Sequence, residues 1–392
     1  MMRSLDLFSG IGGFSLALRD VTTTVAYCEI DPYSRAVLED NMRQNNIDKA
    51  PIFRDVTQLK STDVAKLRPE IVMGGFPCQD IAFSGHGAGL DGSRSNLFFE
   101  IVRIVRSSDT IEHVFLENSP FIRMRGLDRV LASLRSMGFR HVVYGYLSAS
   151  DVGAVHKRTR WVCLASKDPS KLRLNTLTKH RQRMRFDWSA EPVPRVVRRF
   201  PPEEQHRNAT MQDRVSMLGN SVVPQFIAHV YDTFSRALRL TALMTPTALA
   251  KSYPEVEDVG HRGVLYVATD SNMQNNSRKK KTTVWRQLPY REYASNTLDL
   301  HLVDHNGKEF YSIERWYTPV HSRSAWVHVL RKTKKGRWMC NTANNIYYER
   351  KTRAKPRVHV INPEFIEHLM GYPIGWTEAA VKLQRVPRHS IA

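Results

Sequence analysis

Residues 6–14 read Asp6-Leu7-Phe8-Ser9-Gly10-Ile11-Gly12-Gly13-Phe14, which is the pattern of a strand, a glycine-rich turn and the start of a helix. Glycines let the backbone of such a turn pass close to a bound nucleoside. Glu29 ends the next strand-like run, at about the spacing where an acidic residue meets ribose hydroxyls in dinucleotide folds. The phosphate-binding spacing GxGxxG is not met, so the turn favours a phosphate-free nucleoside such as S-adenosyl-L-methionine over a nicotinamide dinucleotide.

Residues 4–165 continue this alternation of strand-like and helical stretches. Such alternation is typical of an α/β fold with a mostly parallel sheet and helices on both faces, in which ligands bind beyond the carboxyl ends of the strands. The strand-like runs are Leu5–Phe8, Thr24–Tyr27, Ile71–Met73, His113–Leu116, Val142–Leu147 and Trp161–Ala165.

The rest of the chain is less regular. Residues 168–214 are polar, basic and proline-containing, which predicts an irregular excursion, whereas residues 223–243 return to a helical pattern. After Pro246 the sequence changes to short strands and basic loops, so we expect a boundary there. Near the end, residues 362–370 predict a short helix that glycine and proline terminate.

Length and composition restrict the class of protein. A chain of 392 residues can bury a sizeable core and is long enough for two domains. It contains no run of 18 apolar residues and no signal-peptide pattern. We therefore expect a protein without a membrane partner that is not secreted and stays inside the cell, in the cytoplasm of a prokaryotic or virus-infected cell or in a nucleus.

The charge is strongly positive and unevenly distributed. The formal net charge is +20, and residues 278–358 supply +13 of it, with 19 Lys or Arg against 6 Asp or Glu. Tryptophans and tyrosines are interleaved with these charges. A solvated basic face is one interpretation, but the interleaved aromatics favour a nucleic acid partner, because neutralising phosphates releases counterions.

One cysteine lies on a turn. Gly74-Gly75-Phe76-Pro77-Cys78-Gln79 follows the apolar run Ile71–Met73, and a glycine-rich stretch follows over residues 81–99. A lone cysteine is more often a small buried hydrophobe, but a thiol on a tight turn before a glycine-rich loop is typical of a nucleophile. The four cysteines of the chain have no zinc spacing, so we expect neither a metal nor a disulfide.

Two further segments carry charged groups. Glu117 follows the apolar run that starts at His113, where a part-buried carboxyl would have a raised pKa and could donate to a ring nitrogen. Arg158 and Arg160 are two residues apart, so in an extended stretch they share a face. Alternatively, Glu117 is a helix cap and the arginines are ordinary surface charge.

Together, these segments resemble the DNA (cytosine-5) methyltransferase family. The resemblance runs through residues 4–165 and resumes at Leu218-Gly219-Asn220-Ser221-Val222-Val223-Pro224. Its Pro-Cys-Gln, Glu-Asn and Arg-x-Arg elements are highly specific in that order. It implies a Rossmann-like S-adenosylmethionine-dependent methyltransferase sheet of the α/β class with a smaller, basic target-recognition domain. The implied protein is a monomer that methylates double-stranded DNA with S-adenosyl-L-methionine and no metal.

The resemblance also assigns roles to residues. The resemblance implies that the catalytic residues are Cys78, Glu117, Arg158 and Arg160. Glu29 would hold the ribose, Ile30 would lie on the adenine and Asp55 would bind its amino group. The full set of cofactor-binding residues is Phe8, Gly10, Gly12, Gly13, Phe14, Glu29, Ile30, Asp55, Val56, Pro77, Asn220 and Ser221, with Asn220 and Ser221 expected to open a late helix. DNA contacts are expected from Gln79, Ser84 and Arg94.

The implied chemistry explains these residue types. Carbon 5 of cytosine is too electron-poor to attack a sulfonium methyl unaided, so the Cys78 thiolate would first add to carbon 6. Glu117 would stabilise charge near nitrogen 3, and the arginines would fix the base. The cytosine must be flipped out of the duplex for this to occur. The resemblance thereby associates the chain with DNA methylation, base flipping and restriction–modification systems.

The sequence departs from the family pattern in three ways. His156 stands where Gln is usual, and Ser119 where Val is usual. The helix expected after Asn362 ordinarily precedes the Gly-Asn-Ser-Val block, yet here it follows it, so the block order looks partly permuted. We therefore divide the chain into a catalytic and cofactor-binding domain (1–167), an irregular basic excursion (168–214), a completing helix (215–244), a target-recognition region (245–360) and a C-terminal helix that packs back on the core (361–392).

Two other functions fit the same residues. An RNA cytosine methyltransferase of this fold would share every catalytic residue. A DNA-binding protein could keep the fold without the activity, although such proteins typically lose the cysteine or the glutamate, and both are present here.

Overall fold

The computed structural model describes residues 1–77, 97–154, 156, 158–175, 186–188, 192–198, 200–201, 204–244, 248, 264–270, 283–289, 328–332, 338–342 and 359–379. Cys78, Gln79, Ser84 and Arg94 lie outside the described residues, as does most of the predicted recognition region 245–360.

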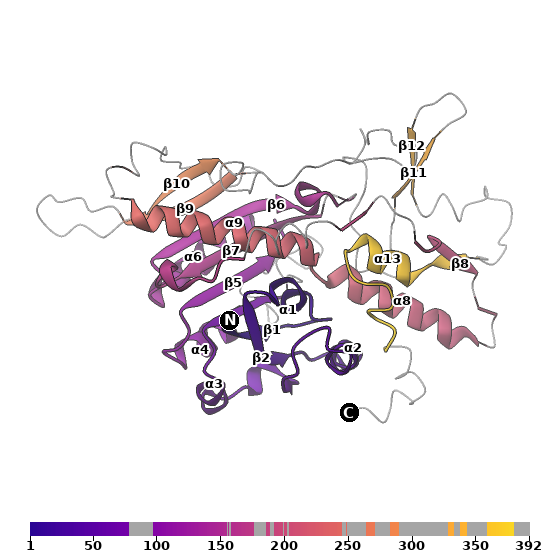
Figure 1. Cartoon of the computed structure of the whole chain (residues 1–392), viewed down its shortest axis with the longest axis horizontal. Coiled ribbons are helices and arrows are strands. Elements are labelled where there is room, and N and C mark those ends of the chain that lie inside the picture. The colour runs from indigo at the N-terminus through magenta and orange to yellow at the C-terminus, as the bar shows by residue number, and fades with distance from the viewer. Residues whose placement is uncertain are drawn as a thin grey trace, which may run out of the picture.

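A nine-stranded sheet forms the centre of the described part of the chain (Figure 1), with the order β10-β9-β6-β7-β5-β4-β1-β2-β3. Its strands are β1 Met2–Leu7, β2 Thr22–Cys28, β3 Ile52–Phe53, β4 Ile71–Gly75, β5 His113–Asn118, β6 His141–Ser148, β7 Thr159–Ser166, β9 Val264–Asp270 and β10 Thr283–Pro289. Each of the six strand-like runs predicted from the sequence overlaps one of these strands, so the α/β class is confirmed.

Neighbouring strands pair in parallel on one side of the sheet and antiparallel on the other. Strands β3, β2, β1, β4 and β5 run parallel, whereas β7 pairs antiparallel with both β5 and β6, and β9 and β10 continue the antiparallel half. Because β7 is antiparallel to both of its neighbours, β6 runs in the same direction as β5, so the mostly parallel sheet predicted for residues 4–165 is confirmed, with β7 as its reversed strand. The reason is local: β7 follows β6 after the short 3-10 turn Ala149–Val152, too few residues for a crossover that would return the chain in the same direction.

Helices cover both faces of the sheet, as the alternation predicts. They are α1 Gly13–Leu18, α2 Pro32–Arg43, α3 Ser61–Leu67, α4 Leu97–Arg106, α5 Ile122–Arg125, α6 Leu127–Ser136, α8 Gln205–Asn220, α9 Pro224–Leu243 and α13 Pro363–Leu369, with 3-10 turns at Val56–Gln58 and Pro169–Lys171. Successive strand side chains point to opposite faces, so Ile71 and Met73 join the core under α1, α2 and α9, while Val72 joins the core under α3, α4 and α6. Burial on both faces explains why the strands are apolar throughout.

Several described segments after residue 167 form regular elements, and some of them join the main sheet, which the sequence did not predict. Residues 205–214, expected to be irregular, form the first part of α8. The strand β8 (Val196–Arg198) pairs antiparallel with β13 (His359–Ile361), so the excursion meets the end of the chain. Because β9 and β10 extend the main sheet beside β6, the expected boundary at residue 245 does not coincide with the sheet edge.

The helix predicted at residues 362–370 is confirmed as α13. Asn362 caps it by accepting a hydrogen bond from the backbone N–H of Glu364 (3.1 Å), and Pro363 occupies the first turn, where its missing N–H costs nothing. Gly371 follows with φ +77°, a left-handed conformation that suits glycine. Figure 1 shows α13 lying beside α8, although about 140 residues separate them in the sequence. Phe365, Ile366 and Leu369 of α13 are buried in the same core as α1, α2 and α9, so this helix packs against the core.

Candidate active site

The glycine-rich turn lies where β1 ends, next to the end of β2. The backbone N–H of Ser9 donates to the Cys28 carbonyl (3.0 Å), and the N–H of Gly10 donates to Oε2 of Glu29 (2.7 Å). The other carboxylate oxygen of Glu29 accepts from the N–H of Asp31 (2.8 Å). The structure therefore brings Glu29 to the turn, as its spacing predicted. Burial raises the pKa of Glu29, partly offset by these two N–H donors.

The turn is open on one side and tightly packed on the other. Phe8 has φ +54°, which is rare for a residue with a side chain and is a feature that clusters at functional sites. A Cβ on Gly10 would meet no atom within 4 Å, whereas one on Gly12 would lie 3.1 Å from Leu38 and one on Gly13 2.3 Å from the Tyr372 hydroxyl. Open space therefore lies beside Gly10.

Two of the predicted cofactor residues occupy different environments. Ile30 is 71% exposed directly after the part-buried Glu29, so an apolar side chain is available beside a carboxylate. Phe14 is buried and packs its ring edge-on against Phe115 (5.6 Å between centroids), which makes it a core residue that holds α1 on the sheet. The open space at Gly10, the carboxylate of Glu29 and the exposed Ile30 fit a nucleoside with a hydroxylated sugar and an apolar base face.

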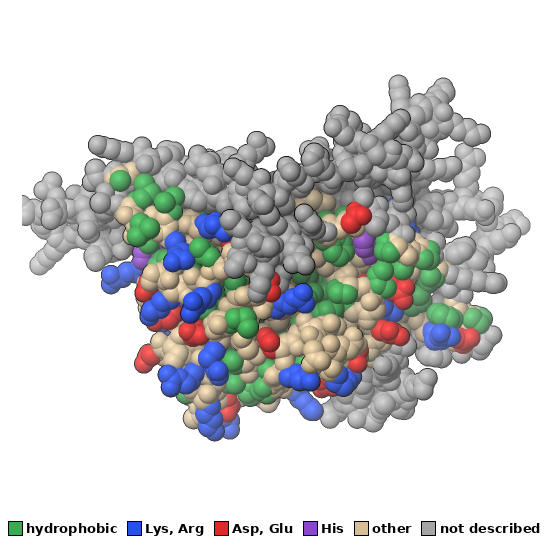
Figure 2. Space-filling view, in the orientation of Figure 1, with side chains coloured by type: hydrophobic (Ala, Val, Ile, Leu, Met, Phe, Trp, Pro, Cys, Tyr) green, Lys and Arg blue, Asp and Glu red, His purple; other side chains and the backbone are tan. Residues whose placement is uncertain are grey.

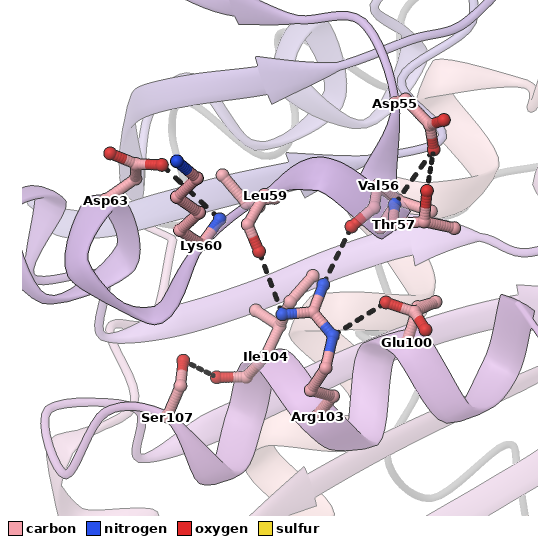
Figure 3. A network of polar contacts seen from close by, with 10 residues as sticks. All are labelled: Asp55, Val56, Thr57, Leu59, Lys60, Asp63, Glu100, Arg103, Ile104 and Ser107. Atoms are coloured by element: carbon pink, nitrogen blue, oxygen red, sulfur yellow. Dashed lines mark hydrogen bonds and ion pairs between the residues drawn. The ribbon is translucent and has the colours of Figure 1, made fainter.

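Asp55 and Val56 lie on a loop that a neighbouring helix anchors. Asp55 caps a 3-10 turn by accepting hydrogen bonds from the N–H (2.9 Å) and the hydroxyl (2.8 Å) of Thr57. Figure 3 shows Arg103 of α4 reaching this loop, where its guanidinium donates to the carbonyls of Val56 (2.9 Å) and Leu59 (2.8 Å). Glu100, three residues earlier on α4, pairs with Arg103 at 2.7 Å. Arg103 was not predicted from the sequence; the Glu100–Arg103 spacing alone indicates only a surface pair.

Asn220 and Ser221 close α8 and do not open α9. Asn220 is the last residue of α8, and Ser221 caps its end through a hydrogen bond from its hydroxyl to the Leu218 carbonyl (2.8 Å). The next helix begins at Pro224. The prediction that these residues open a helix was wrong, because the helix starts where proline fits the first turn. Asn220 is exposed and Ser221 is buried.

Glu117 and Arg160 form an ion pair at the carboxyl end of β5. Nε of Arg160 lies 2.8 Å from Oε1 of Glu117. Burial raises the pKa of Glu117, whereas the positive charges of Arg160 and Arg158 lower it, and the net shift is upward. This agrees with the raised pKa expected from the sequence.

The strand that leads to Cys78 ends beside this pair. Gly75 of β4 is paired with Glu117 of β5, and a Cβ on Gly75 would lie 2.8 Å from Oε2 of the glutamate. The side-chain amide of Asn118 donates to the Phe76 carbonyl (3.2 Å), which fixes the backbone immediately before Pro77. Glycine at position 75 therefore leaves the space that the carboxylate occupies, and Pro77 is the last residue described before the cysteine.

Arg158 does not share a face with Arg160. Its φ is +34°, and its guanidinium donates to the carbonyls of Gly219 (3.0 Å) and Ser221. The alternation of side chains holds only in extended backbone, and β7 begins at Thr159, one residue later. Arg158 thus lies buried against the turn that carries Ser221, while its charge still acts on Glu117.

The C-terminal segment supplies residues that the sequence did not single out. Trp376 donates from its indole N–H to the Ile11 carbonyl in the glycine-rich turn (2.9 Å), and the Tyr372 hydroxyl donates to the Val222 carbonyl (3.0 Å). His156, which departs from the family pattern, bonds through Nε2 to the Leu369 carbonyl (2.9 Å). Burial lowers the pKa of His156 to about 3, so the ring is neutral. No local periodicity marks Trp376 or Tyr372.

Neither a metal centre nor a membrane span is found among the described residues. In that part of the chain, no group of three or more His, Cys, Asp or Glu side chains is placed to hold a metal ion. Over the same residues, none of the helices combines the length and the apolar character that a membrane span requires.

Comparisons with known proteins give one family. The sequence model described as "C-5 cytosine-specific DNA methylase" matches residues 2–383. The chain is 30% identical over 233 residues to the type II methyltransferase M.CviJI of Paramecium bursaria Chlorella virus IL3A, covering 58% of each. It is 32% identical over 164 residues to the type II methyltransferase M.HhaI of Haemophilus parahaemolyticus, covering 41% of this chain and 47% of that protein. The chain spans about half the length of these curated relatives.

Among solved structures, the chain is similar to the methyltransferase EhMeth of Entamoeba histolytica. The TM-score is 0.40 at 15% identity, over 54% of this chain and 66% of that one.

Proposed function

The chain belongs to the C-5 cytosine-specific DNA methylase family, and we propose that it transfers a methyl group from S-adenosyl-L-methionine to carbon 5 of a flipped-out cytosine in a specific sequence of double-stranded DNA. The observation that carries this proposal is the part-buried Glu117–Arg160 pair beside the strand end that leads to Pro77 and Cys78. Burial raises the pKa of Glu117, and in this proposal the acid acts beside the Cys78 thiol.

The cofactor supplies an electrophilic methyl group, and the chain's residues prepare the base to accept it. The Cys78 thiolate forms a bond to carbon 6 of the cytosine, which breaks the double bond between carbons 5 and 6 and makes carbon 5 nucleophilic. Glu117 donates a proton toward nitrogen 3, and Arg160 holds the carboxyl in place through its ion pair. After carbon 5 has gained the methyl group, a base removes its proton and the sulfur leaves.

Cofactor binding in this proposal uses the open side of the glycine-rich turn. Glu29 holds the ribose hydroxyls, Ile30 covers the adenine and Asp55 accepts from the adenine amino group. Val56 and Pro77 complete the wall of the pocket, and the Asn220–Ser221 turn closes it from the other side. The open space beside Gly10 and the exposure of Ile30 support this assignment.

DNA recognition is assigned to residues 245–360 within the same proposal, because residues 278–358 carry +13 of the net charge of +20. Gln79, Ser84 and Arg94 would contact the DNA around the flipped base. The enzyme would act as a monomer, and the type II methyltransferases among its relatives favour a place in a restriction–modification system.

Labelled methyl transfer tests the proposed activity. The full chain is incubated with S-adenosyl-L-methionine carrying a labelled methyl group and with either duplex DNA or transfer RNA. We expect label in 5-methylcytosine of the duplex only. Label in transfer RNA but not in DNA would overturn the proposed substrate, and label in neither would overturn the activity.

The role of the thiol is tested with two alanine variants. Cys78→Ala should abolish transfer while leaving cofactor binding nearly unchanged. Cys163→Ala is the matched control, because Cys163 is fully buried in β7 and burial raises the pKa of its thiol, which keeps it protonated and unreactive. Transfer that survives Cys78→Ala would contradict the mechanism.

A further inference from the structure

The segment that ends the described chain, residues 362–379, reaches the cofactor turn from the far end of the sequence. The Trp376 indole donates to the Ile11 carbonyl (2.9 Å), between the two glycines that shape the turn. Asn41 of α2 donates to the Trp376 carbonyl (3.1 Å), so the tryptophan is fixed through both its side chain and its backbone. Trp376 and Asn41 are both buried.

A second contact of this segment fixes the turn after Ser221. The Tyr372 hydroxyl donates to the Val222 carbonyl (3.0 Å), and the rings of Tyr372 and Trp376 lie 5.4 Å apart. A Cβ on Gly13 would fall 2.3 Å from the Tyr372 hydroxyl and 2.6 Å from Val222. The glycine-rich turn, the Ser221–Val222 turn and the C-terminal segment therefore meet with no space between them.

The C-terminal segment is itself held rigidly. The buried carboxylate of Glu367 accepts hydrogen bonds from the N–H groups of Gly375 (2.6 Å) and Thr377 (2.8 Å) and pairs with Arg214 of α8 (3.0 Å). Satisfied buried networks of this kind rigidify the structure around them. The hydrogen bonds and ion pair of Glu367 thus hold Trp376 in one position relative to the glycine-rich turn.

Two backbone groups of the glycine-rich turn are consequently held by different parts of the chain. Glu29 holds the N–H of Gly10 on the ligand side, and Trp376 holds the carbonyl of Ile11 on the other side. On the basis of the proposed function, we propose that Tyr372 and Trp376 are positioning residues: acting through Val222 and Ile11, they hold both turns in the shape that binds S-adenosyl-L-methionine. Cofactor affinity then depends on a segment that follows the basic region in sequence.

Binding of S-adenosyl-L-homocysteine to the full chain tests this proposal without requiring methyl transfer. Tyr372→Phe removes one oxygen atom, and Trp376→Phe removes the indole N–H. Each variant lacks one hydrogen bond to a backbone carbonyl, so we expect calorimetry to show binding weakened about twofold to tenfold in each. The KM for S-adenosyl-L-methionine should rise by the same factor, with kcat unchanged.

Two control variants remove equivalent bonds away from the turn. The Trp188 indole donates to the Leu369 carbonyl (3.2 Å) of the same segment, and the Tyr231 hydroxyl donates to the Arg173 carbonyl (3.0 Å). Both side chains are buried. Trp188→Phe and Tyr231→Phe should leave cofactor affinity at the wild-type value, even if they lower the unfolding temperature as much as the test variants do.

The outcomes separate the two proposals. Wild-type affinity in Tyr372→Phe and Trp376→Phe, or equal weakening in the control variants, would overturn the positioning role. A wild-type chain that binds S-adenosyl-L-homocysteine but methylates no DNA would overturn the proposed function, while the binding comparison would still decide the role of Tyr372 and Trp376. A wild-type chain without any binding would overturn both.

Discussion

Glu117 experiences two opposing effects on its carboxyl group. Burial raises its pKa, and the guanidinium of Arg160 at 2.8 Å lowers it, with burial the larger effect. A carboxyl poised in this way can be protonated when cytosine arrives and can return to the ion pair after donating. The same acid in water would be almost fully ionised at neutral pH.

Replacing Glu117 by glutamine tests this role. Glu117→Gln keeps the size of the side chain but cannot transfer a proton, so kcat should fall about 100-fold or more, with little change in the KM for the cofactor. The control is Glu112→Gln, which removes a carboxyl at the opposite end of β5, where it pairs with Lys171. An unchanged kcat in Glu117→Gln would contradict the role.

The pH dependence follows from the direction of the shift. In the proposed mechanism the active form of Glu117 is protonated, so kcat should fall as the pH rises through the raised pKa of this carboxyl. The wild-type profile, measured from about pH 6 to about pH 9.5, should show this falling limb, and Glu117→Gln should lack it. A falling limb of the same position in both proteins would assign it to another group.

Sequence spacing predicted some residues of the site and not others, for a local reason. Glu29 could be placed because it follows a regular strand, and the carboxyl end of that strand lies next to the glycine-rich turn. Arg158 could not, because its positive φ breaks the alternation that holds in a strand. The roles of Trp376 and Tyr372 depend on tertiary contacts that no spacing in the sequence reveals.

At the scale of elements, α4 fixes the loop that carries Asp55. Arg103 donates to two carbonyls of this loop, and Glu100 holds its guanidinium (Figure 3). The carboxylate of Asp55 itself bonds to Thr57 within the same loop, so that bond shapes the loop without attaching it to the rest of the fold. The position of Asp55 is therefore coupled to α4.

Arg103→Ala should loosen this loop and weaken the binding of the adenine. We expect the KM for S-adenosyl-L-methionine to rise about tenfold, because two charge-assisted hydrogen bonds are removed, while kcat at saturating cofactor stays near the wild-type value. Arg106→Ala is the control, since Arg106 is exposed on the same helix and bonds to Ser136. Equal KM values in the two variants would show that Arg103 does not position the loop.

Elements with a clear hydrophobic period were predictable, and those without one were not. The strands were found because their side chains are buried on both faces, which gives apolar runs. The helix α13 was found because asparagine and proline mark its start. The first ten residues of α8 were missed because Gln205–Arg214 contains few apolar residues to reveal a period.

Over the whole molecule, the net positive charge is concentrated in one stretch of the sequence. Figure 2 shows Lys, Arg, Asp and Glu side chains interspersed over the described part of one face, without a single dominant basic patch. Residues 278–358 carry most of this excess, +13 of the net +20. The sheet and its two cores could be predicted from periodicity, whereas the joining of β9 and β10 to that sheet could not, because a short strand's partner is set by long-range contacts.

Salt dependence tests the assignment of this charge to DNA binding. Replacing Arg278, Lys279, Lys280 and Lys281 by glutamine should weaken duplex binding and make the slope of log K against log salt less negative, by about 0.9 for each phosphate that these side chains neutralise. The control removes four exposed cations of the N-terminal part of the chain: Arg19, Lys49, Lys60 and Lys66. A slope that changes in the control but not in the test variant would contradict this assignment. It would indicate that DNA binds to the N-terminal part of the chain.

The central claim is that a cysteine sulfur bonds to a cytosine ring held outside the duplex. Fluorine at carbon 5 cannot leave as a proton does, so the final elimination is blocked once the methyl group has been transferred. With S-adenosyl-L-methionine and a duplex containing 5-fluorocytosine at the target position, the wild-type chain should gain the mass of the modified strand under denaturing conditions, and Cys78→Ser should not. No such adduct with the wild-type chain, or an equal adduct with Cys78→Ser, would contradict the account.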